Sequence, residues 1–203
     1  EEREVTGKHL ERFQKVLDLT KEYLEMLGMA DALPGNLSIR IESHIPPAVG
    51  LASSAAVFSC LARAIAGLIA EEATLTDEQV SVIARLGSGS AARSVMGGFV
   101  ALEAGEGESI DAAKAVQIAD ENHWLLHDIV VIPSQEEKKI GSTEGHALAA
   151  TSPYFAARIE AIRTRRQREC IDAILRKDFE KLQHVSEEDA LDMHHVMETS
   201  DPP

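Results

Sequence analysis

Hydrophobic and polar positions change their spacing along the 203-residue chain, and each spacing predicts a different element. From residue 6 to residue 27, apolar side chains recur every three or four positions, which is typical of an amphipathic helix that ends near Gly28. From 37 to 43 they alternate with polar side chains, which predicts a strand with one apolar face. That face consists of Leu37, Ile39 and Ile41.

The segment from Ala55 to Ala70 is apolar on almost every side, which predicts a buried, central helix. It follows the strand across a loop that contains proline and glycine. Cys60 falls on an apolar side of this helix, and Cys170 falls on an apolar side of a later one. We therefore expect both thiols to be buried, in a protein of a reduced compartment.

Local signals place the next elements. Thr76 and Gln79 have the spacing of a capping box, so a helix is expected to begin there and to end near Gly87. Small residues from 88 to 98 predict a loop that leads into a short helix. The apolar run 99–103 after them predicts a strand.

The second half of the chain contains two more apolar runs that predict strands, 115–119 and 128–132. A helix is expected to start at Ser152-Pro153, with the serine as N-cap and the proline in the first turn. A last helix is expected to start near Asp178.

Strands and helices that do not alternate strictly favour an α+β fold. The length suits one or two domains, and a polar connection that contains glycine predicts a boundary between 105 and 124. We place an N-terminal lobe at 1–120 and a C-terminal lobe at 121–203.

The composition is that of a globular protein, with 44% apolar and 27% charged residues. The formal net charge of −14 argues against nucleic-acid binding, which needs a basic surface. Any anionic ligand must therefore be held by a few local cations and backbone amides. No apolar run predicts a membrane span, and the acidic start of the chain predicts no signal peptide. We expect a cytoplasmic protein.

The loop between the first strand and the second helix has the arrangement that a phosphate needs. A helix N-terminus presents backbone N–H groups without helical partners, and its dipole favours an anion. Gly50 lets the backbone approach closely, Ser53 and Ser54 add hydroxyls, and Ser54 is a candidate contact for a phosphate-bound magnesium ion. The alternative is an ordinary turn with a serine N-cap. The loop is not a Walker A motif, because no Gly-Lys-Ser/Thr follows.

The stretch Ser88-Gly89-Ser90-Ala91-Ala92-Arg93 combines hydroxyls, small residues and one arginine. Such a loop can hold a phosphate through amides and hydroxyls, while the guanidinium binds a carboxylate or phosphate oxygen. On its own, this stretch favours a flexible surface turn over a ligand-binding loop.

Together, the two stretches are more specific. Pro-x-x-x-Gly-Leu-Ala-Ser-Ser-Ala-Ala at 46–56 and Gly-Ser-Gly-Ser-Ala-x-Arg-Ser-x-x-Gly-Gly-Phe-Val at 87–100 resemble the GHMP kinase superfamily. More narrowly, they resemble its mevalonate diphosphate decarboxylase and phosphomevalonate decarboxylase branch. Later stretches at 115–124, 138–145 and 189–203 support the resemblance, which covers nearly all of the chain from Leu37 onward.

The resemblance implies a two-lobed GHMP kinase-like α+β fold and an ATP-dependent carboxy-lyase of isoprenoid biosynthesis. ATP, bound with Mg²⁺, would phosphorylate the 3-hydroxyl of a phosphorylated mevalonate. The new phosphate would then leave as CO2 is lost, giving an isopentenyl product. The resemblance also implies a small-molecule substrate, no nucleic-acid or membrane partner, and a homodimer.

The resemblance assigns roles residue by residue. ATP would be bound by Pro47, Gly50, Leu51, Ala52, Ser53, Ser54 and Ala55. The substrate would be bound by Ser88, Gly89, Ser90, Ala91, Ala92, Arg93, Ser142 and Thr143. Arg93 is the expected catalytic residue, because its guanidinium can anchor the phosphate and the carboxylate of the substrate. No metal ligand is expected beyond Ser54.

Two motifs of the resembled family are absent: an early one that contains lysine and a late one that carries the catalytic aspartate. We expect both to lie outside this chain, before Glu1 and after Pro203, in a longer protein. Three functions therefore stay open: decarboxylation, 3-phosphorylation by a small-molecule kinase, and nucleotide binding without catalysis. The number of phosphates on the substrate also stays open. Lys138 and Lys139 are either contacts to such a phosphate or solvated loop lysines.

Overall fold

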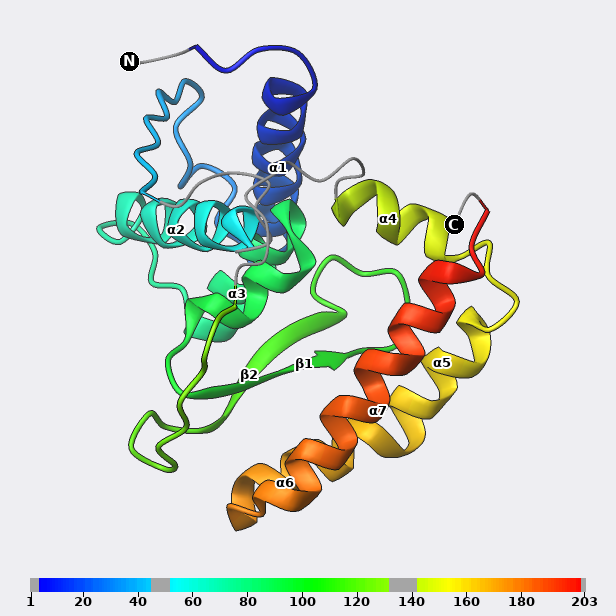
Figure 1. Ribbon diagram of the computed structural model, residues 1–203. Helices are drawn as coiled ribbons and strands as arrows, with labels where there is room; N and C mark the ends of the chain where they lie inside the picture. The colour runs from blue at the N-terminus through cyan, green and yellow to red at the C-terminus, as the bar shows by residue number, and fades with distance from the viewer. Residues whose placement is uncertain (1–3, 45–51, 132–141, 202–203) are drawn as a thin grey trace. The chain divides into compact units, whose positions relative to one another are not determined.

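A computed structural model describes residues 4–44, 52–131 and 142–201 of the protein (Figure 1). The chain divides into two compact units, Glu1–Asp120 and Glu121–Pro203, which are described separately below. Within the described residues, no helix combines the length and the hydropathy that crossing a membrane requires.

In its described residues, 4–44 and 52–120, the first unit contains three α-helices, a 3-10 helix and two strands. They are α1 (Gly7–Met26), α2 (Ser53–Leu68), α3 (Asp77–Gly87), η1 (Gly89–Val95), β1 (Phe99–Ala104) and β2 (Ala113–Ala119). The helices and strands expected in these six regions are confirmed, with small differences at their ends.

Local chemistry sets the ends of these helices. Gly28 has a φ of +76°, which favours glycine, and its N–H donates to the Glu25 carbonyl at 2.9 Å just after α1. At the start of α3, Thr76 Oγ1 accepts from the Gln79 N–H at 3.2 Å, and Gln79 Oε1 accepts from the Thr76 N–H at 2.8 Å. The capping box is therefore confirmed.

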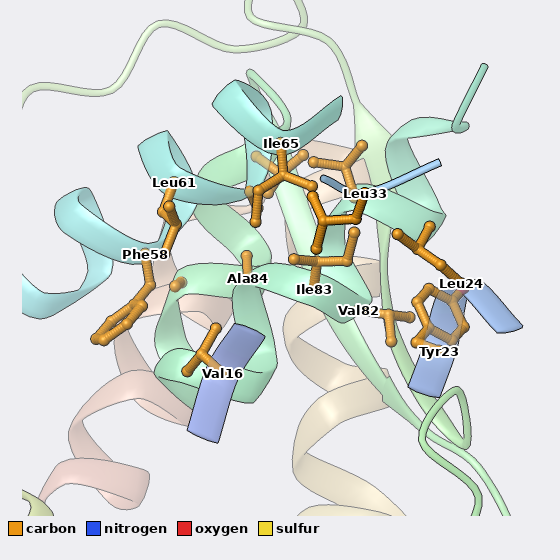
Figure 2. Packing of buried hydrophobic residues seen from close by; sticks show 14 of the residues in the cluster. Val16, Tyr23, Leu24, Leu33, Phe58, Leu61, Ile65, Val82, Ile83 and Ala84 are labelled. Carbon is orange, nitrogen blue, oxygen red and sulfur yellow. The ribbon is translucent and has the colours of Figure 1, made fainter. Parts of the chain in front are cut away.

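The core of the first unit lies between α1, α2 and α3 (Figure 2). Leu24 of α1, Ile65 of α2 and Ile83 of α3 are buried there, and burial of such a side chain contributes about 1.5–3 kcal/mol. Thr20 is also buried, and its hydroxyl donates to the Val16 carbonyl at 2.7 Å. This core fixes the three helices against one another.

Strands β1 and β2 pair antiparallel, with Leu102 opposite Ala115. Hydrogen bonds fasten the sheet to α3. The buried Ser81 hydroxyl accepts from the Ala115 N–H at 2.9 Å, and Arg85 Nε donates to the Ala113 carbonyl at 2.9 Å. Helix α3 therefore joins the helical core to the sheet.

The second unit is helical in its described part. It contains α4 (Ser142–Ala149), α5 (Phe155–Ala161), the π-helical turn η2 (Ile162–Arg166), α6 (Gln167–Arg176) and α7 (Phe179–Glu198). The continuous helical stretch from α5 to α6 lies beside α7 (Figure 1).

Both predicted helix starts in this unit lie close to observed ones. The Asp178 carboxylate accepts from the Lys181 N–H at 3.0 Å and caps α7, as expected. Helix α5 begins at Phe155 rather than at Ser152. The Ser152 hydroxyl accepts from the Tyr154 N–H at 3.2 Å, so it caps the turn before the helix instead of the helix itself.

Arginines at the α5–α6 junction pair with carboxylates of α7. Arg158 Nη2 lies 3.0 Å from Asp189 Oδ2, and Arg165 Nη1 lies 3.0 Å from Glu188 Oε2, while Arg166 bonds to Asp192. Hydrogen bonds from Arg165 hold the pKa of Glu188 below its usual value. Burial works to raise the pKa of Asp192, but the hydrogen bond and charge of Arg166 outweigh it, so this pKa is also lowered.

Two predicted strands are wrong. Residues 37–44 and 128–131 form no strand ladder, and residue 132 lies outside the described residues. Ile41 is 42% exposed and Ile129 is 85% exposed. A strand exists only when a second strand pairs with it, and no described segment pairs with either run.

The prediction that α2 is buried all round is also wrong. Phe58, Leu61 and Ile65 face the core, whereas Cys60 is exposed and Leu68 is 52% exposed on the outer side. No described element covers that side, so its apolar pattern produces no burial. Cys170 is half-buried, and neither cysteine forms a disulfide.

Candidate functional site

The two stretches that resemble ligand-binding loops meet in the first unit. Ser54, in the first turn of α2, and Ser88, just after α3, have their hydroxyl oxygens 3.4 Å apart. Ser88 Oγ also lies 3.3 Å from Ser90 Oγ. These three hydroxyls come from segments that are more than thirty residues apart in the sequence, and they form one polar cluster.

The N-terminus of α2 has the features of an anion site. The helix begins at Ser53, and no described side chain caps it. Ala52 has a φ of 50°, and its carbonyl accepts from the Ala55 N–H at 2.8 Å. The first N–H groups of a helix have no helical acceptor, so this end offers donors next to the Ser54 hydroxyl.

The second loop, residues 88–93, is buried on the side of its alanines and exposed to solvent on the side of Arg93. The Ser88 N–H donates to the Ala84 carbonyl at 3.1 Å, which continues α3, and the Ala91 N–H donates to the Ser88 carbonyl at 2.9 Å. Ala91 and Ala92 are fully buried, whereas Arg93 is exposed. The expected short helix that carries Arg93 is therefore present as η1. In the described part of the chain, the Arg93 guanidinium makes no ion pair and remains available to an anion.

A hollow of about 490 Å³ adjoins the start of α2. Its apolar surface includes Val57 and Phe58, and Ser53 and Ser54 line it as well. The other lining residues are Glu4, Val5, Thr6, His9, Arg12, Phe13 and Ile41. The hollow therefore places apolar surface and charged side chains beside the predicted phosphate site.

Arg12 of α1 is a site-adjacent residue that the sequence reasoning missed. Its Nε donates to the Gly87 carbonyl at 3.1 Å, and its guanidinium lies 4.7 Å above the centre of the Phe58 ring. Gly87 is the last residue of α3 and immediately precedes Ser88. The only sequence signal was a cation beside Phe13 on the predicted first helix, and nothing in it pointed to a carbonyl 75 positions away.

The structure describes some of the predicted site residues and not others. Ala52, Ser53, Ser54 and Ala55 lie at the start of α2, and residues 88–93 lie at the end of α3 and in η1. Ser142 and Thr143 begin α4 in the second unit. Pro47, Gly50, Leu51, Lys138 and Lys139 lie outside the described residues.

Among the described residues, no group of three His, Cys, Asp or Glu side chains could hold a metal ion. The oxygens at the α2 end are the hydroxyls of Ser53 and Ser54, which are neutral and can each supply one ligand. Magnesium commonly keeps several waters and takes other ligands from substrate phosphates. This donor set therefore fits a magnesium ion that arrives bound to a nucleotide.

Two family models match the chain on either side of the boundary between its units. The diphosphomevalonate decarboxylase-like N-terminal domain matches residues 1–113, and the mevalonate 5-diphosphate decarboxylase C-terminal domain matches residues 128–203. The chain belongs to the diphosphomevalonate decarboxylase family. This result confirms the family resemblance that the two loops indicate, within the GHMP kinase superfamily.

Individual relatives agree with the family models. The chain is 39% identical over 200 residues to the diphosphomevalonate decarboxylase of Saccharomyces cerevisiae, a match that covers 95% of this chain and 50% of that protein. A crystal structure of a mevalonate 5-diphosphate decarboxylase is 35% identical, with a TM-score of 0.77, and covers 100% of this chain and 53% of that one. The chain thus spans about half the length of the relatives that it matches.

A further solved structure is that of the protein MDDEF in complex with MVAPP, AMPPCP and magnesium. It is 23% identical, with a TM-score of 0.69, and covers 98% of this chain and 58% of that one. At this identity the likeness concerns the fold. The solved diphosphomevalonate decarboxylases confirm the predicted α+β, GHMP kinase-like fold.

Proposed function

We propose that the polypeptide to which this chain belongs is an ATP-dependent decarboxylase of diphosphomevalonate. The observation that carries the proposal is the 3.4 Å approach of Ser54 to Ser88. It brings the two loops that are typical of the family into one cluster. Family membership, and relatives named diphosphomevalonate decarboxylase, support the reaction and favour a diphosphate over a monophosphate.

The chain's own residues have distinct roles in this proposal. The amides at the start of α2, from Ala52 to Ser54, and the Ser54 hydroxyl bind the phosphates of ATP, and Ala55 borders this site. Bound magnesium supplies charge neutralisation of those phosphates. Ser54 is its candidate protein contact. Phosphoryl transfer depends mainly on positioning and charge, which suits a site built from amides and hydroxyls.

The segment Ser88–Arg93 binds the phosphorylated mevalonate. The 3-hydroxyl releases its proton, and its oxygen takes the γ-phosphoryl group of ATP, which leaves ADP. The C–O bond to the new phosphate then breaks. The C–C bond to the carboxylate breaks as well, and its electron pair forms the new C=C double bond. Phosphate, CO2 and isopentenyl diphosphate are released.

Arg93 acts in this scheme as an electrostatic anchor. It binds the anionic substrate by its fixed positive charge and neutralises charge on the departing phosphate. Its exposure and freedom from ion pairs within the described residues support this role. Ser142 and Thr143, at the start of α4, are proposed to bind the substrate phosphate as well.

Location and assembly belong to the same proposal. The acidic composition and the two cysteines without a disulfide support a cytoplasmic enzyme. A homodimer stays an expectation from the family resemblance, and sedimentation of the full polypeptide would measure it.

The test is to replace Arg93 with Met in the full polypeptide and to measure CO2 release from diphosphomevalonate and ATP. Loss of one such electrostatic group commonly costs about 10²–10³ in rate, and we expect kcat/KM to fall by about that factor. Arg163→Met is the matched control, since Arg163 is an exposed arginine of the second unit. Near-normal kcat/KM in R93M would refute the role of Arg93.

The wild-type protein decides between the alternatives in the same assay. A 3-phosphorylated product without CO2 would select the small-molecule kinase. Nucleotide binding without turnover would select a non-catalytic module. Comparing the monophosphate with the diphosphate substrate measures which one the enzyme prefers.

A further inference from the structure

We propose that Arg12 and Arg63 are positioning residues that hold the segment from Ser88 to Val95 at its two ends. The inference rests on the proposed function of this segment as the substrate site. Neither arginine is in a motif that the sequence analysis singled out. Each one reaches the segment from a different helix, Arg12 from α1 and Arg63 from α2.

Arg12 holds the beginning of the segment. Both its Nε, at 3.1 Å, and its Nη2 donate to the carbonyl of Gly87, the residue before Ser88. The Phe58 ring lies under the guanidinium, with its centre 4.7 Å away, and limits its movement. A guanidinium held by a ring and a carbonyl keeps a defined orientation.

Arg63 holds the end of the segment. Its Nη2 donates to the carbonyl of Val95, the last residue of η1, at 2.7 Å. Its Nη1 lies 2.6 Å from Asp77 Oδ1, at the start of α3. This second contact orients the guanidinium, so that one side chain connects α2, α3 and η1.

The segment depends on outside support because of its own geometry. A 3-10 helix has poorer hydrogen bonds than an α-helix and is usually short. No described side chain caps η1 at its start. Hydrogen bonds from charged donors are about twice as strong as neutral ones, and here they reach the carbonyls at both ends. Arg93 lies between the two supported ends.

Arg12 also changes the electrostatics of the site. Ser88 lies at the C-terminus of α3, where the helix dipole places partial negative charge and disfavours an anion. The positive charge of Arg12 sits directly on the last carbonyl of that helix. The charge of Arg12 therefore offsets the partial negative charge at the C-terminus of α3. This is where the Ser88 and Ser90 hydroxyls would bind a substrate phosphate.

The experiment replaces Arg12 with Met in the full polypeptide. Methionine keeps apolar packing over Phe58 but removes the donors and the charge. We expect hydrogen exchange of the backbone amides from 88 to 95 to become about tenfold faster, because the charged hydrogen bonds to the Gly87 carbonyl are lost. We also expect the KM for diphosphomevalonate to rise about tenfold, with the KM for ATP within about twofold of wild type.

Two further variants of α1 separate positioning from general stability. Arg12→Lys keeps the charge and one donor, so it is expected to recover most of the substrate KM. Lys15→Met, on the same helix, makes the same change of charge away from Gly87 and is expected to alter neither quantity. Arg63→Met is expected to speed exchange most strongly near Val95.

The outcomes are distinguishable. Unchanged exchange at 88–95 in both R12M and R63M would overturn the inference. Faster exchange with an unchanged KM for diphosphomevalonate would also overturn it. An equal rise in the KM values for diphosphomevalonate and ATP would do the same, because it would reflect a smaller folded fraction. If the wild-type polypeptide turns over no phosphorylated mevalonate, the proposed function fails. The substrate-positioning inference, which rests on that function, then fails with it, whereas the exchange result still decides whether the two arginines hold the segment.

Discussion

Substitution of Gly87 by alanine tests the packing that places Ser88. An added Cβ would lie 2.0 Å from Phe58 Cδ1 and 2.3 Å from Phe58 Cγ, whereas carbon atoms in contact normally lie about 3.5–4.0 Å apart. Phe58 has little room to move away. It is 4% exposed, its ring centre is 5.3 Å from that of Phe13, and Arg12 covers one ring face.

The cost follows from these distances. Overpacking of a core typically destabilises by about 1–3 kcal/mol, and the rigid surroundings of Phe58 place G87A at the upper end. Alanine gains about 0.5–1 kcal/mol over glycine in a helix, which offsets part of that cost. We therefore expect a net loss of about 2 kcal/mol in the free energy of unfolding of the first unit.

Thermal unfolding followed by circular dichroism measures this loss. For a unit of this size, 1 kcal/mol shifts Tm by about 4 °C, so G87A should unfold about 8 °C below wild type. Trp124 is the only tryptophan and lies in the second unit, so its fluorescence reports separately on that unit.

Gly67→Ala is the matched control for the same substitution. Nothing lies within 4 Å of a Cβ at Gly67, which is an exposed residue of α2. G67A should therefore raise Tm by a few degrees, by removing the helix cost of glycine. A Tm for G87A equal to or above that of wild type would refute the reasoning, because it would show that Phe58 yields without cost.

Three other measurements test separate features. Thr76→Ala removes one half of the capping box and should lower the free energy of unfolding by about 1 kcal/mol in urea titrations, while an unchanged midpoint would contradict the cap. The pKa values of Glu188 and Asp192 are lowered, so the stabilisation by these carboxylates is complete above pH 4.5 and is lost as the pH falls below 3.8. Acid should therefore unfold the second unit, which Trp124 fluorescence measures. Glu188→Gln should make the stability of this unit depend less on pH. Burial raises the pKa of Tyr23 from 10.0 to about 12, so its contribution to stability is intact below pH 10 and is lost between pH 10 and 12. The test uses the Tyr154→Phe variant, in which Tyr23 is the only tyrosine, and tyrosinate absorbance that appears near pH 10 in that folded variant would contradict this assignment.

The helices of this protein other than α4 (Ser142–Ala149), which the sequence reasoning missed, could be predicted because their signals are local. The capping box of Thr76 and Gln79 and the cap at Asp178 involve residues that are three positions apart, so the sequence contains both partners. The apolar periodicity identifies the core face of α1 only in part, since Leu24 is buried whereas Leu10 is 52% exposed. Tertiary contacts then fix the helices that these signals begin.

The wrong predictions share one physical cause, which is that no element among the described residues pairs with or covers the predicted face. Alternation at 37–43 identifies a face that could pair and pack, but pairing needs a second strand that local sequence does not specify. In the same way, Cys60 lies on an apolar side of α2, yet burial requires a neighbour on that side. Pattern indicates which faces are suited to burial, and only the rest of the fold determines which faces are buried.

The residues of the candidate site also divide into those that packing buries and those that stay exposed. The Ser88–Arg93 motif predicts a loop with a free arginine, and the structure explains why its residues are small. Ala91 and Ala92 are fully buried against the helices, so a larger side chain at either position would displace the loop. Part of the motif is therefore required by packing, whereas the exposed Ser90 and Arg93 have no packing reason and are the residues that we expect to meet a ligand.

The arginines behind the loop could not be predicted, because they recognise backbone carbonyls, which every residue has. Arg12 donates to the Gly87 carbonyl and Arg63 donates to the Val95 carbonyl. Neither contact requires a particular side chain at the accepting residue. A motif thus records the groups that would touch a ligand. The groups that keep such a loop in place are visible only once the helices that carry them are packed together.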